Sequence, residues 1–220
     1  MSDRLDMTVT YTVHGALRRE LRQLARATAR PHPDPRHVLR TAPGWAMFRS
    51  ALHAHQTAED EALWPPLRRG LVGRPFDLTR LEAIEAEHAA LVSLVGAIDE
   101  ALADPDVGLD LLGELTGSLV TGLDKHLDHE EEAVFPLVRS VLSQEQWDLF
   151  GRAHARRIEP DAARLLPWLL DGADARTVAS VLAQILPEPA RHAYVHRWRP
   201  AYEALDPWGT RGTRALTGTW

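Results

Sequence analysis

Hydrophobic residues recur every three or four positions along most of the chain, the period of an amphipathic helix. Leu17, Leu21 and Leu24 fall on one face of a first helix, predicted over about residues 11–30. The same period predicts three more long helices, over about 43–63, from Asp77 onward and over about 109–141. Four helices with short connections predict an all-α fold, an antiparallel four-helix bundle.

Prolines and polar residues set the expected helix boundaries. Residues 31–35 read Pro-His-Pro-Asp-Pro and predict a linker. The second helix should end at Trp64-Pro-Pro, because proline has no N–H to donate. Asp77 is the expected N-cap of the third helix. Pro136 is expected to kink the fourth.

The bundle needs only residues 1–141, so residues 142–220 are predicted to form a C-terminal helical extension. Ser143 is a plausible N-cap for a helix that passes through His154 to about residue 170. Two shorter helices are expected over 174–186 and 188–205. The extension is rich in tryptophan, which favours packing onto the bundle, where it could form one wall of a pocket. Its tryptophans are Trp147, Trp168, Trp198, Trp208 and Trp220.

Composition excludes several classes of protein. With 220 residues, 45% of them hydrophobic, the chain can bury a substantial core. It has no cysteine, which rules out disulfides, thiolate metal sites and cysteine nucleophiles. A net charge of −6 with scattered Lys and Arg gives no nucleic-acid footprint. No apolar run suggests a signal peptide or membrane span, so we expect a cytoplasmic protein with no membrane partner.

One motif occurs twice in the chain. Residues 55–65 and 126–136 both read His-x3-Glu-x4-aromatic-Pro. Residues four apart lie on one face of a helix, so the histidine and glutamate of each copy can reach the same metal. Each copy follows an isolated histidine in a helical stretch, His14 before the first and His88 before the second. The duplicated order predicts one metal site.

The predicted ligands are His14, His55, Glu59, His88, His126 and Glu130. Unpaired carboxylates in a bundle core would be costly, and a pair of divalent ions removes that cost. Two glutamates can bridge two metals while imidazoles fill the terminal positions. By ligand type, such a site suits iron, manganese or zinc.

On these motifs the chain resembles the hemerythrin-like family, the HHE cation-binding domains, over about residues 9–140. The resemblance implies a four-helix bundle around a non-haem centre of two iron ions that reacts with dioxygen. It implies terminal ligation by the four histidines and bridging by Glu59 and Glu130. Iron is therefore favoured over manganese and zinc.

The chain departs from the family's oxygen carriers at one position. These carry a fifth histidine, from a pair four apart on the third helix, but Ile84 and Val92 flank His88 at that spacing. Either another side chain fills the place, or coordination sites stay open to water, oxygen or substrate. An open centre favours oxygen activation over reversible carriage. The candidates for an additional ligand, or a group behind the ligands, are Glu85, Glu87, His129 and His154.

Neighbouring polar residues have simpler interpretations. Asp60 and Glu131 follow the two predicted bridging glutamates and should point about 100° away round an α-helix, towards solvent. For His154, a surface or interhelical hydrogen-bonding role is preferred to ligation. His192 and His196 are four apart but have no carboxylate in their motif, so a wet helix face is preferred to a second metal site.

Two functions remain open. The leading hypothesis is an oxidase or oxygenase that uses dioxygen, or a related small oxidant, on a small organic substrate; no catalytic acid or base is identifiable. The alternative is a non-catalytic module that binds, senses or stores oxygen, nitric oxide or iron. The enzyme predicts an organic-sized pocket between the bundle and the C-terminal helices, whereas the module predicts none.

Overall fold

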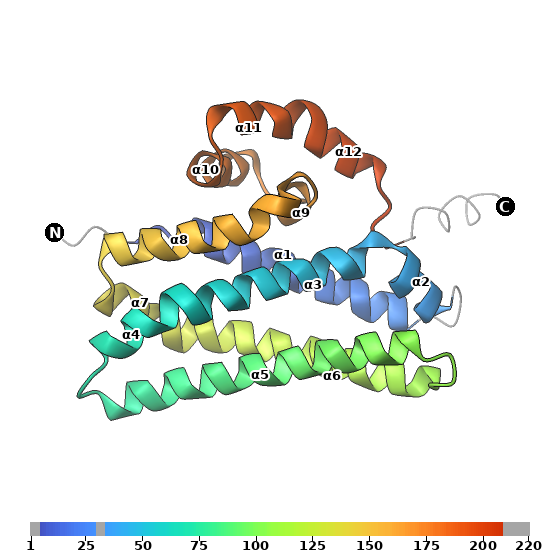
Figure 1. Cartoon of the computed structure of the whole chain (residues 1–220), viewed down its shortest axis with the longest axis horizontal. Helices are drawn as coiled ribbons and strands as arrows, with labels where there is room; N and C mark the ends of the chain where they lie inside the picture. Colours follow the sequence, from blue (N-terminus) through green and yellow to red (C-terminus); the bar gives the residue numbers. More distant parts are fainter. Residues whose placement is uncertain (1–4, 30–33, 209–220) are drawn as a thin grey trace.

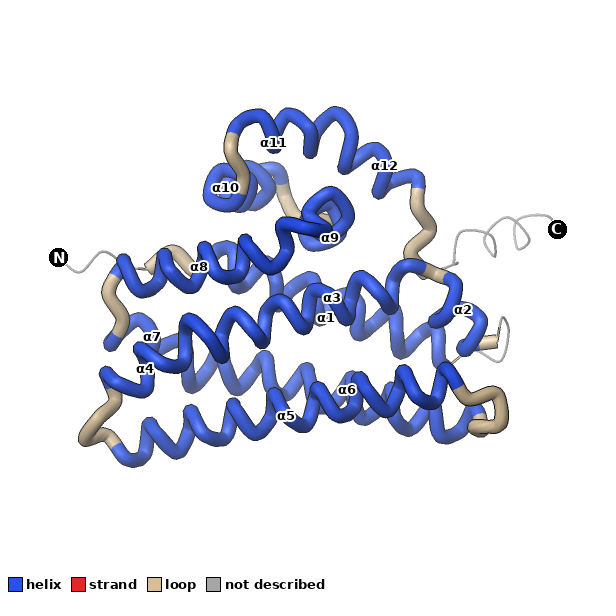
Figure 2. Tube along the Cα trace, viewed as in Figure 1, coloured by secondary structure: helices blue, strands red, loops and turns tan. Residues whose placement is uncertain are grey.

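The computed structural model describes residues 5–29 and 34–208, and every regular element in these ranges is a helix. The all-α class is therefore confirmed for the described chain (Figure 2). None of the described helices combines the length and hydropathy needed to cross a bilayer. The start of the predicted linker, residues 31–33, lies outside the described ranges, as does Trp220.

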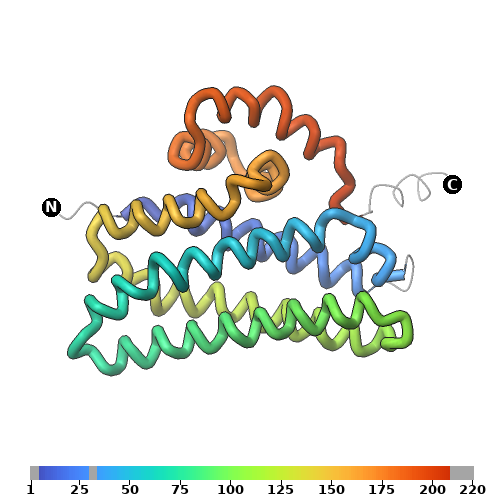
Figure 3. Tube along the Cα trace, in the orientation of Figure 1, coloured from blue at the N-terminus to red at the C-terminus, as the bar shows by residue number. Residues whose placement is uncertain are grey.

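Four long helices lie side by side, and each runs back along the one before it (Figures 1 and 3). They are α1 (Thr8–Thr28), α3 (Pro43–Ala58), α5 (Pro75–Ala103) and α6 (Leu109–His129). Helix α6 packs against both α5 and α1, and α1 packs against α3. A short helix not expected from the sequence, α2 (Pro35–Thr41), precedes α3 and is capped by Asp34.

The predicted stop at Trp64-Pro-Pro was wrong. Helix α3 continues through a π-helical turn, η1 (Glu59–Leu63), into α4 (Trp64–Gly70). In this wider turn the N–H of Trp64 donates to the carbonyl of Glu59, five residues back. Pro65 falls in the first turn of α4, where a missing N–H costs little. The prolines thus mark a change of helix type.

The second copy of the motif behaves in the same way. Helix α6 passes through η2 (Glu130–Val134) into α7 (Phe135–Val141), and the N–H of Phe135 donates to the carbonyl of Glu130. The kink expected near Pro136 therefore takes the form of a π-helical turn. Inserted turns of this kind are rare and occur frequently at functional sites.

The start of α5 also differs from the prediction. The helix begins at Pro75 rather than after Asp77, because proline's fixed φ suits the first helical position. The Asp77 carboxylate accepts a hydrogen bond from Nε of Arg74 at 2.7 Å. Asp77 therefore lies within the first turn of α5 and does not cap it.

The C-terminal helices lie against α1 and α3. Ser143 and Gln146 form the expected capping box at the start of the first of them. The long helix predicted to reach residue 170 is interrupted at Pro160 by a 3-10 turn. The elements are α8 (Gln144–Ile158), η3 (Glu159–Asp161), α9 (Ala162–Leu169), α10 (Ala175–Ile185), α11 (Glu188–Ala193), η4 (Tyr194–Trp198) and α12 (Arg199–Ala204).

Tryptophans from this region hydrogen-bond to the bundle. The indole N–H of Trp147 donates to the carbonyl of Asp6 at 2.9 Å, and that of Trp208 donates to Glu20 at 2.7 Å. Nη2 of Arg19 donates to the carbonyl of Trp168 at 2.5 Å. These contacts hold α8, α9 and the end of the described chain against α1 and the residue Asp6 before it.

The buried apolar residues form two clusters with the predicted ligands between them. Along α5, Ile84 belongs to one cluster and Leu91 to the other, and His88 lies between them. Along the α6–α7 segment, Leu123 and Phe135 belong to opposite clusters in the same way. The bundle therefore encloses a polar layer between two apolar layers.

Candidate metal centre

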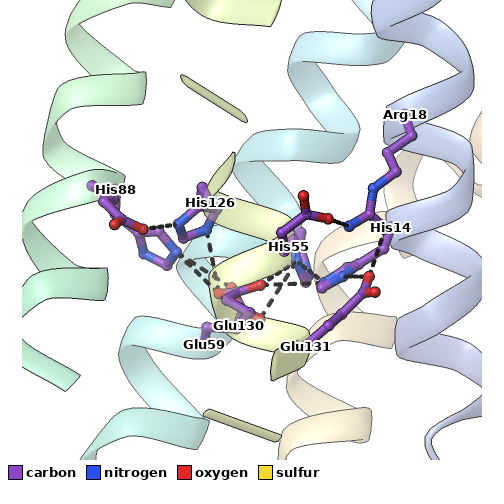
Figure 4. Close-up of polar contacts among 10 residues, drawn as sticks. His14, Arg18, His55, Glu59, His88, His126, Glu130 and Glu131 are labelled. Atoms are coloured by element: carbon purple, nitrogen blue, oxygen red, sulfur yellow. Dashed lines mark hydrogen bonds and ion pairs between the residues drawn. The ribbon is translucent and has the colours of Figure 1, made fainter. Parts of the chain in front are cut away.

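All six predicted ligands meet in this polar layer. Each is buried, with no more than 4% of its surface exposed. Figure 4 shows Glu59 and Glu130 in the middle, with His88 and His126 on one side and His14 and His55 on the other. The histidines come from four different helices, and each glutamate is the first residue of a π-helical turn.

One half of the centre contains His14 and His55, together with an oxygen from each glutamate. Nε2 of His14 lies 3.3 Å from Oε2 of Glu130, and Nε2 of His55 lies 3.4 Å from Oε1 of Glu59. The two Nε2 atoms are 3.2 Å apart. Neighbouring ligands bonded to one ion at about 2.1 Å lie about 3.0–3.4 Å apart, so this spacing suits a shared cation.

The other half contains His88 and His126. Nε2 of His126 lies 3.3 Å from Oε1 of Glu130, and Nε2 of His88 lies 3.7 Å from the same oxygen. Nε2 of His88 is also 3.5 Å from Oε2 of Glu59. The two oxygens of each glutamate therefore face different halves. In the described chain, groups of at least three potential ligands occur only in these two halves.

The buried oxygens and nitrogens of the centre have few protein partners. Among the described residues, both carboxylate oxygens of Glu59 and of Glu130 are buried without a hydrogen bond, as are Nε2 of His88 and Nε2 of His126. Buried polar atoms are almost always paired, because an unsatisfied one costs free energy. Atoms of these types, converging without partners, fit a site for metal cations.

Carboxylates outside the centre hold three of its histidines. Nδ1 of His14 lies 2.7 Å from Glu131, Nδ1 of His88 lies 2.9 Å from Asp60, and Nδ1 of His126 lies 2.9 Å from Glu87. A carboxylate accepts the Nδ1 proton, so Nε2 faces the centre and offers its lone pair once it has lost its own proton. This is the tautomer and orientation a metal requires.

The expectation that Asp60 and Glu131 point to solvent holds only in part: the Asp60 side chain is 50% exposed and that of Glu131 24%, yet each hydrogen-bonds a predicted ligand. It assumed the rotation of an α-helix, whereas both residues lie in a π-helical turn, where successive side chains rotate less about the axis. Each therefore stays near the face of its preceding glutamate and reaches a histidine on the adjacent helix. Arg18 supports Glu131 with a hydrogen bond of 2.6 Å from Nη1.

The aromatic residues of the repeated motif pack against the centre. The ring of Phe135 lies 5.3 Å from that of His14, and the ring of Trp64 lies 6.1 Å from that of His88, measured between centroids. Each aromatic residue thus packs on the isolated histidine of the other half of the chain. Both are fully buried core residues.

The two glutamates differ in their ionisation. Burial raises the pKa of Glu59 well above its usual value, and the carboxylate of Glu130 raises it further. Burial acts in the same direction on Glu130, but His126, His14 and His88 outweigh it and hold its pKa well below the usual range. The protein groups alone thus stabilise one charged carboxylate, and a cation would stabilise both.

The pKa values of the imidazoles are also shifted in opposite directions. Burial lowers the pKa of His55 well below its usual value, and the nearby His14 lowers it further. Burial also opposes protonation of His88, but Asp60 and Glu130 outweigh it and raise its pKa to about 9. Clustered groups with such divergent pKa values are typical of functional sites.

The candidates for an additional ligand occupy different places. Glu85 is ion-paired with Arg68 at 2.5 Å. Glu87 accepts hydrogen bonds from both His126 and His129. It therefore contacts a predicted ligand from outside the centre. At the fifth-histidine position Ile84 is completely buried in the apolar core. None of these supplies another imidazole to the centre.

His154, expected to have a surface or interhelical hydrogen-bonding role, is buried beside the centre. Its ring lies 6.0 Å from that of His55, nearly perpendicular to it. Burial, aided by Arg157, lowers its pKa to about 4, so it is neutral at pH 7. Sequence alone missed this placement because it depends on how α8 packs against α3. The rings of His192 and His196 lie 4.2 Å apart between centroids, tilted by 44°, and belong to neither ligand group.

A cavity of about 330 Å³ borders the centre on the side of the C-terminal helices. His55 and His154 line it, and its other walls come from α1, α8 and α10, including Val13, Trp147 and Phe150. It is therefore bounded by both the bundle and the extension. Its volume falls at the lower end of the range for small-molecule sites.

The family model of the hemerythrin HHE cation-binding domain matches residues 8–138 and also residues 79–188. The chain belongs to this family. The first match contains all six converging residues, and the second extends past α10 to the first residue of α11, beyond the boundary expected at residue 141. Comparisons with curated proteins and with solved structures find no match. Family and geometry together make this chain a hemerythrin-like protein whose buried His and Glu groups could hold a metal.

Proposed function

We propose that the protein holds two iron ions and uses them to bind and activate dioxygen. One observation carries the proposal: Oε2 of Glu130 faces His14 and Oε1 faces His126, each at 3.3 Å. A carboxylate with one oxygen towards each of two imidazole pairs suits a bridge between two cations. Glu59 repeats the pattern with His55 and His88.

Iron is preferred to manganese or zinc because the family supplies a precedent and because mixed imidazole and carboxylate ligation suits it. Bound iron(II) would supply electrons for the reduction of dioxygen. The residues of the chain would orient the ligands through Asp60, Glu87 and Glu131 and exclude bulk water from the buried layer.

The cavity beside His55 favours an enzyme over a sensing or storage module. An oxidase or oxygenase needs room for an organic substrate next to its metal, whereas a module that binds only oxygen, nitric oxide or iron does not. The aromatic walls at Trp147 and Phe150 suit an apolar substrate, and Gln184 offers a polar contact. We propose that a small organic substrate is oxidised there.

Metal counting by mass spectrometry, after anaerobic reconstitution with iron(II), tests the centre. We expect two irons per chain in the wild type and a large loss in Glu59→Ala and Glu130→Ala. Glu132→Ala is the matched control, since this exposed residue lies in the same π-helical turn as Glu130. Unchanged iron content in both test variants would refute the ligand assignment.

Oxygen uptake in the presence of small organic compounds tests the enzyme. Gly151→Leu should block the cavity, because Gly151 lines it and an added Cβ meets nothing within 4 Å. Gly117→Leu, on the exposed face of α6, adds the same side chain in equally open space and should have no effect. Reversible oxygen binding with no substrate-dependent uptake would instead support the sensing module.

A further inference from the structure

A second cavity lies wholly within the C-terminal helices. Its volume is about 540 Å³, and its lining residues come from the α8–α9 segment and from the segment between α10 and η4. Its walls are mostly apolar and include Ile158, Leu166, Ile185, Leu186 and Trp198. None of the six predicted metal ligands lines it, so it is a different site from the metal centre.

Two arginines of α8 line this cavity without any partner of their own. Arg152 and Arg156 form no hydrogen bond or ion pair with any residue in the described ranges. Neighbouring arginines are paired: Arg157 with Glu61, and Arg199 with Glu203. The lining contains one acidic residue, Glu159, and so carries a net charge of +1.

We propose that this cavity binds an organic carboxylate with an apolar body, such as a medium-chain fatty acid. A guanidinium can hold a carboxylate through two parallel hydrogen bonds, and Arg152 and Arg156 are free to do so. The hydrocarbon would be removed from water against Ile158, Leu166 and Trp198. The two arginines thus match the carboxylate of such a ligand, and the apolar walls match its hydrocarbon chain.

The site is also connected to the cavity at the metal centre. Arg152, Ala155 and Ile185 line both cavities. A carboxylate bound at Arg152 would therefore lie at the boundary between the two. Binding of the anion does not require the metal, so this inference stands or falls separately from the proposed function.

Calorimetric titration of the iron-loaded protein with alkanoates from hexanoate to decanoate, below their micellar concentrations, is the primary test. We expect one saturable site whose affinity rises about fourfold for each added methylene. Acetate should not bind measurably, because it lacks the apolar body. Decylamine should bind at least about tenfold more weakly than decanoate, since it presents the wrong charge. Equal affinity for the two would overturn the proposal.

Variants locate the site. Arg152→Gln combined with Arg156→Gln should weaken decanoate binding at least about tenfold. Arg40→Gln, which removes an exposed charge of α2 that has no partner among the described residues, should not. Ala190→Phe should fill the cavity and abolish binding. Thermal midpoints and iron content check that the variants fold. Full binding by Ala190→Phe would overturn the proposal, as would loss of binding in Gly151→Leu alone, which would place the ligand in the other cavity.

Discussion

Glu131 accepts a hydrogen bond from Nδ1 of His14 over 2.7 Å, although 117 positions separate the two residues in the chain. Asp60 holds His88 in the same way at 2.9 Å. Each of these carboxylates directly follows a proposed bridging glutamate. The repeated motif thus supplies a proposed metal ligand and, at the next position, the carboxylate that hydrogen-bonds a proposed ligand on another helix.

We predict that Glu131→Gln weakens iron binding about 10–100-fold, the usual cost of losing a group that orients a ligand. The uncharged amide would favour the Nδ1 proton less and hold the ring less firmly. Competition with a chelator measures the change. Asp128→Asn is the control, because Asp128 also binds Arg18 but does not contact His14. Equal iron affinity in the wild type and Glu131→Gln would contradict this role.

We predict that Trp64→Ala lowers the free energy of unfolding by about 3–5 kcal/mol, because it leaves a large cavity in the core. Trp64 is 1% exposed and packs against His88. Urea denaturation of the metal-free protein measures the loss. Phe76→Ala, at a position 85% exposed, should change stability by less than about 0.5 kcal/mol. An equally small change for Trp64→Ala would contradict the prediction.

His154 should make the metal-free protein sensitive to acid. Its folded-state pKa of about 4 is below the usual 6.5, so as pH falls through this window the unfolded chain binds a proton that the folded chain does not. Stability should therefore fall from pH 6.5 towards pH 4, by up to about 3 kcal/mol from this group. Denaturation of His154→Leu across that range should show a shallower decline. Identical pH profiles would contradict the prediction.

Gly44 should hold the end of the described chain in place. Its N–H donates to the carbonyl of Pro207 at 2.7 Å, and a Cβ there would lie 2.6 Å from the ring of Trp208. Gly44→Ala should displace this segment and cost about 1–3 kcal/mol. Limited proteolysis after residue 204 should accelerate. Gly117→Ala, which meets no neighbour, should not accelerate it.

The sequence predicted much of the centre because its signal is periodic. The spacing of His55 and Glu59, repeated at His126 and Glu130, needs only an α-helix to bring each pair together. The contributions of Asp60 and Glu131 could not be predicted, since the inserted π-helical turns leave no periodic mark and the prolines suggested a helix end. The repeated proline does mark a change from π-helical to α-helical geometry, but the rules for α-helices predict that a helix ends there.

The C-terminal extension was less predictable for a different reason. Its helices were anticipated from apolar periodicity and from the cap at Ser143, but the burial of His154 depends on contacts between α8 and α3 that no local pattern records. The two cavities likewise arise from the relative placement of α8 and α10. Rules based on local sequence predicted these helices but not how the helices pack against one another.

Anomalous diffraction at the iron absorption edge, from crystals of anaerobically reconstituted protein, tests the central claim most directly. The account predicts two anomalous peaks on opposite sides of the Glu130 carboxylate, one beside His14 and His55 and the other beside His88 and His126. A single peak bound by only one histidine pair, or iron located elsewhere in the molecule, would contradict it.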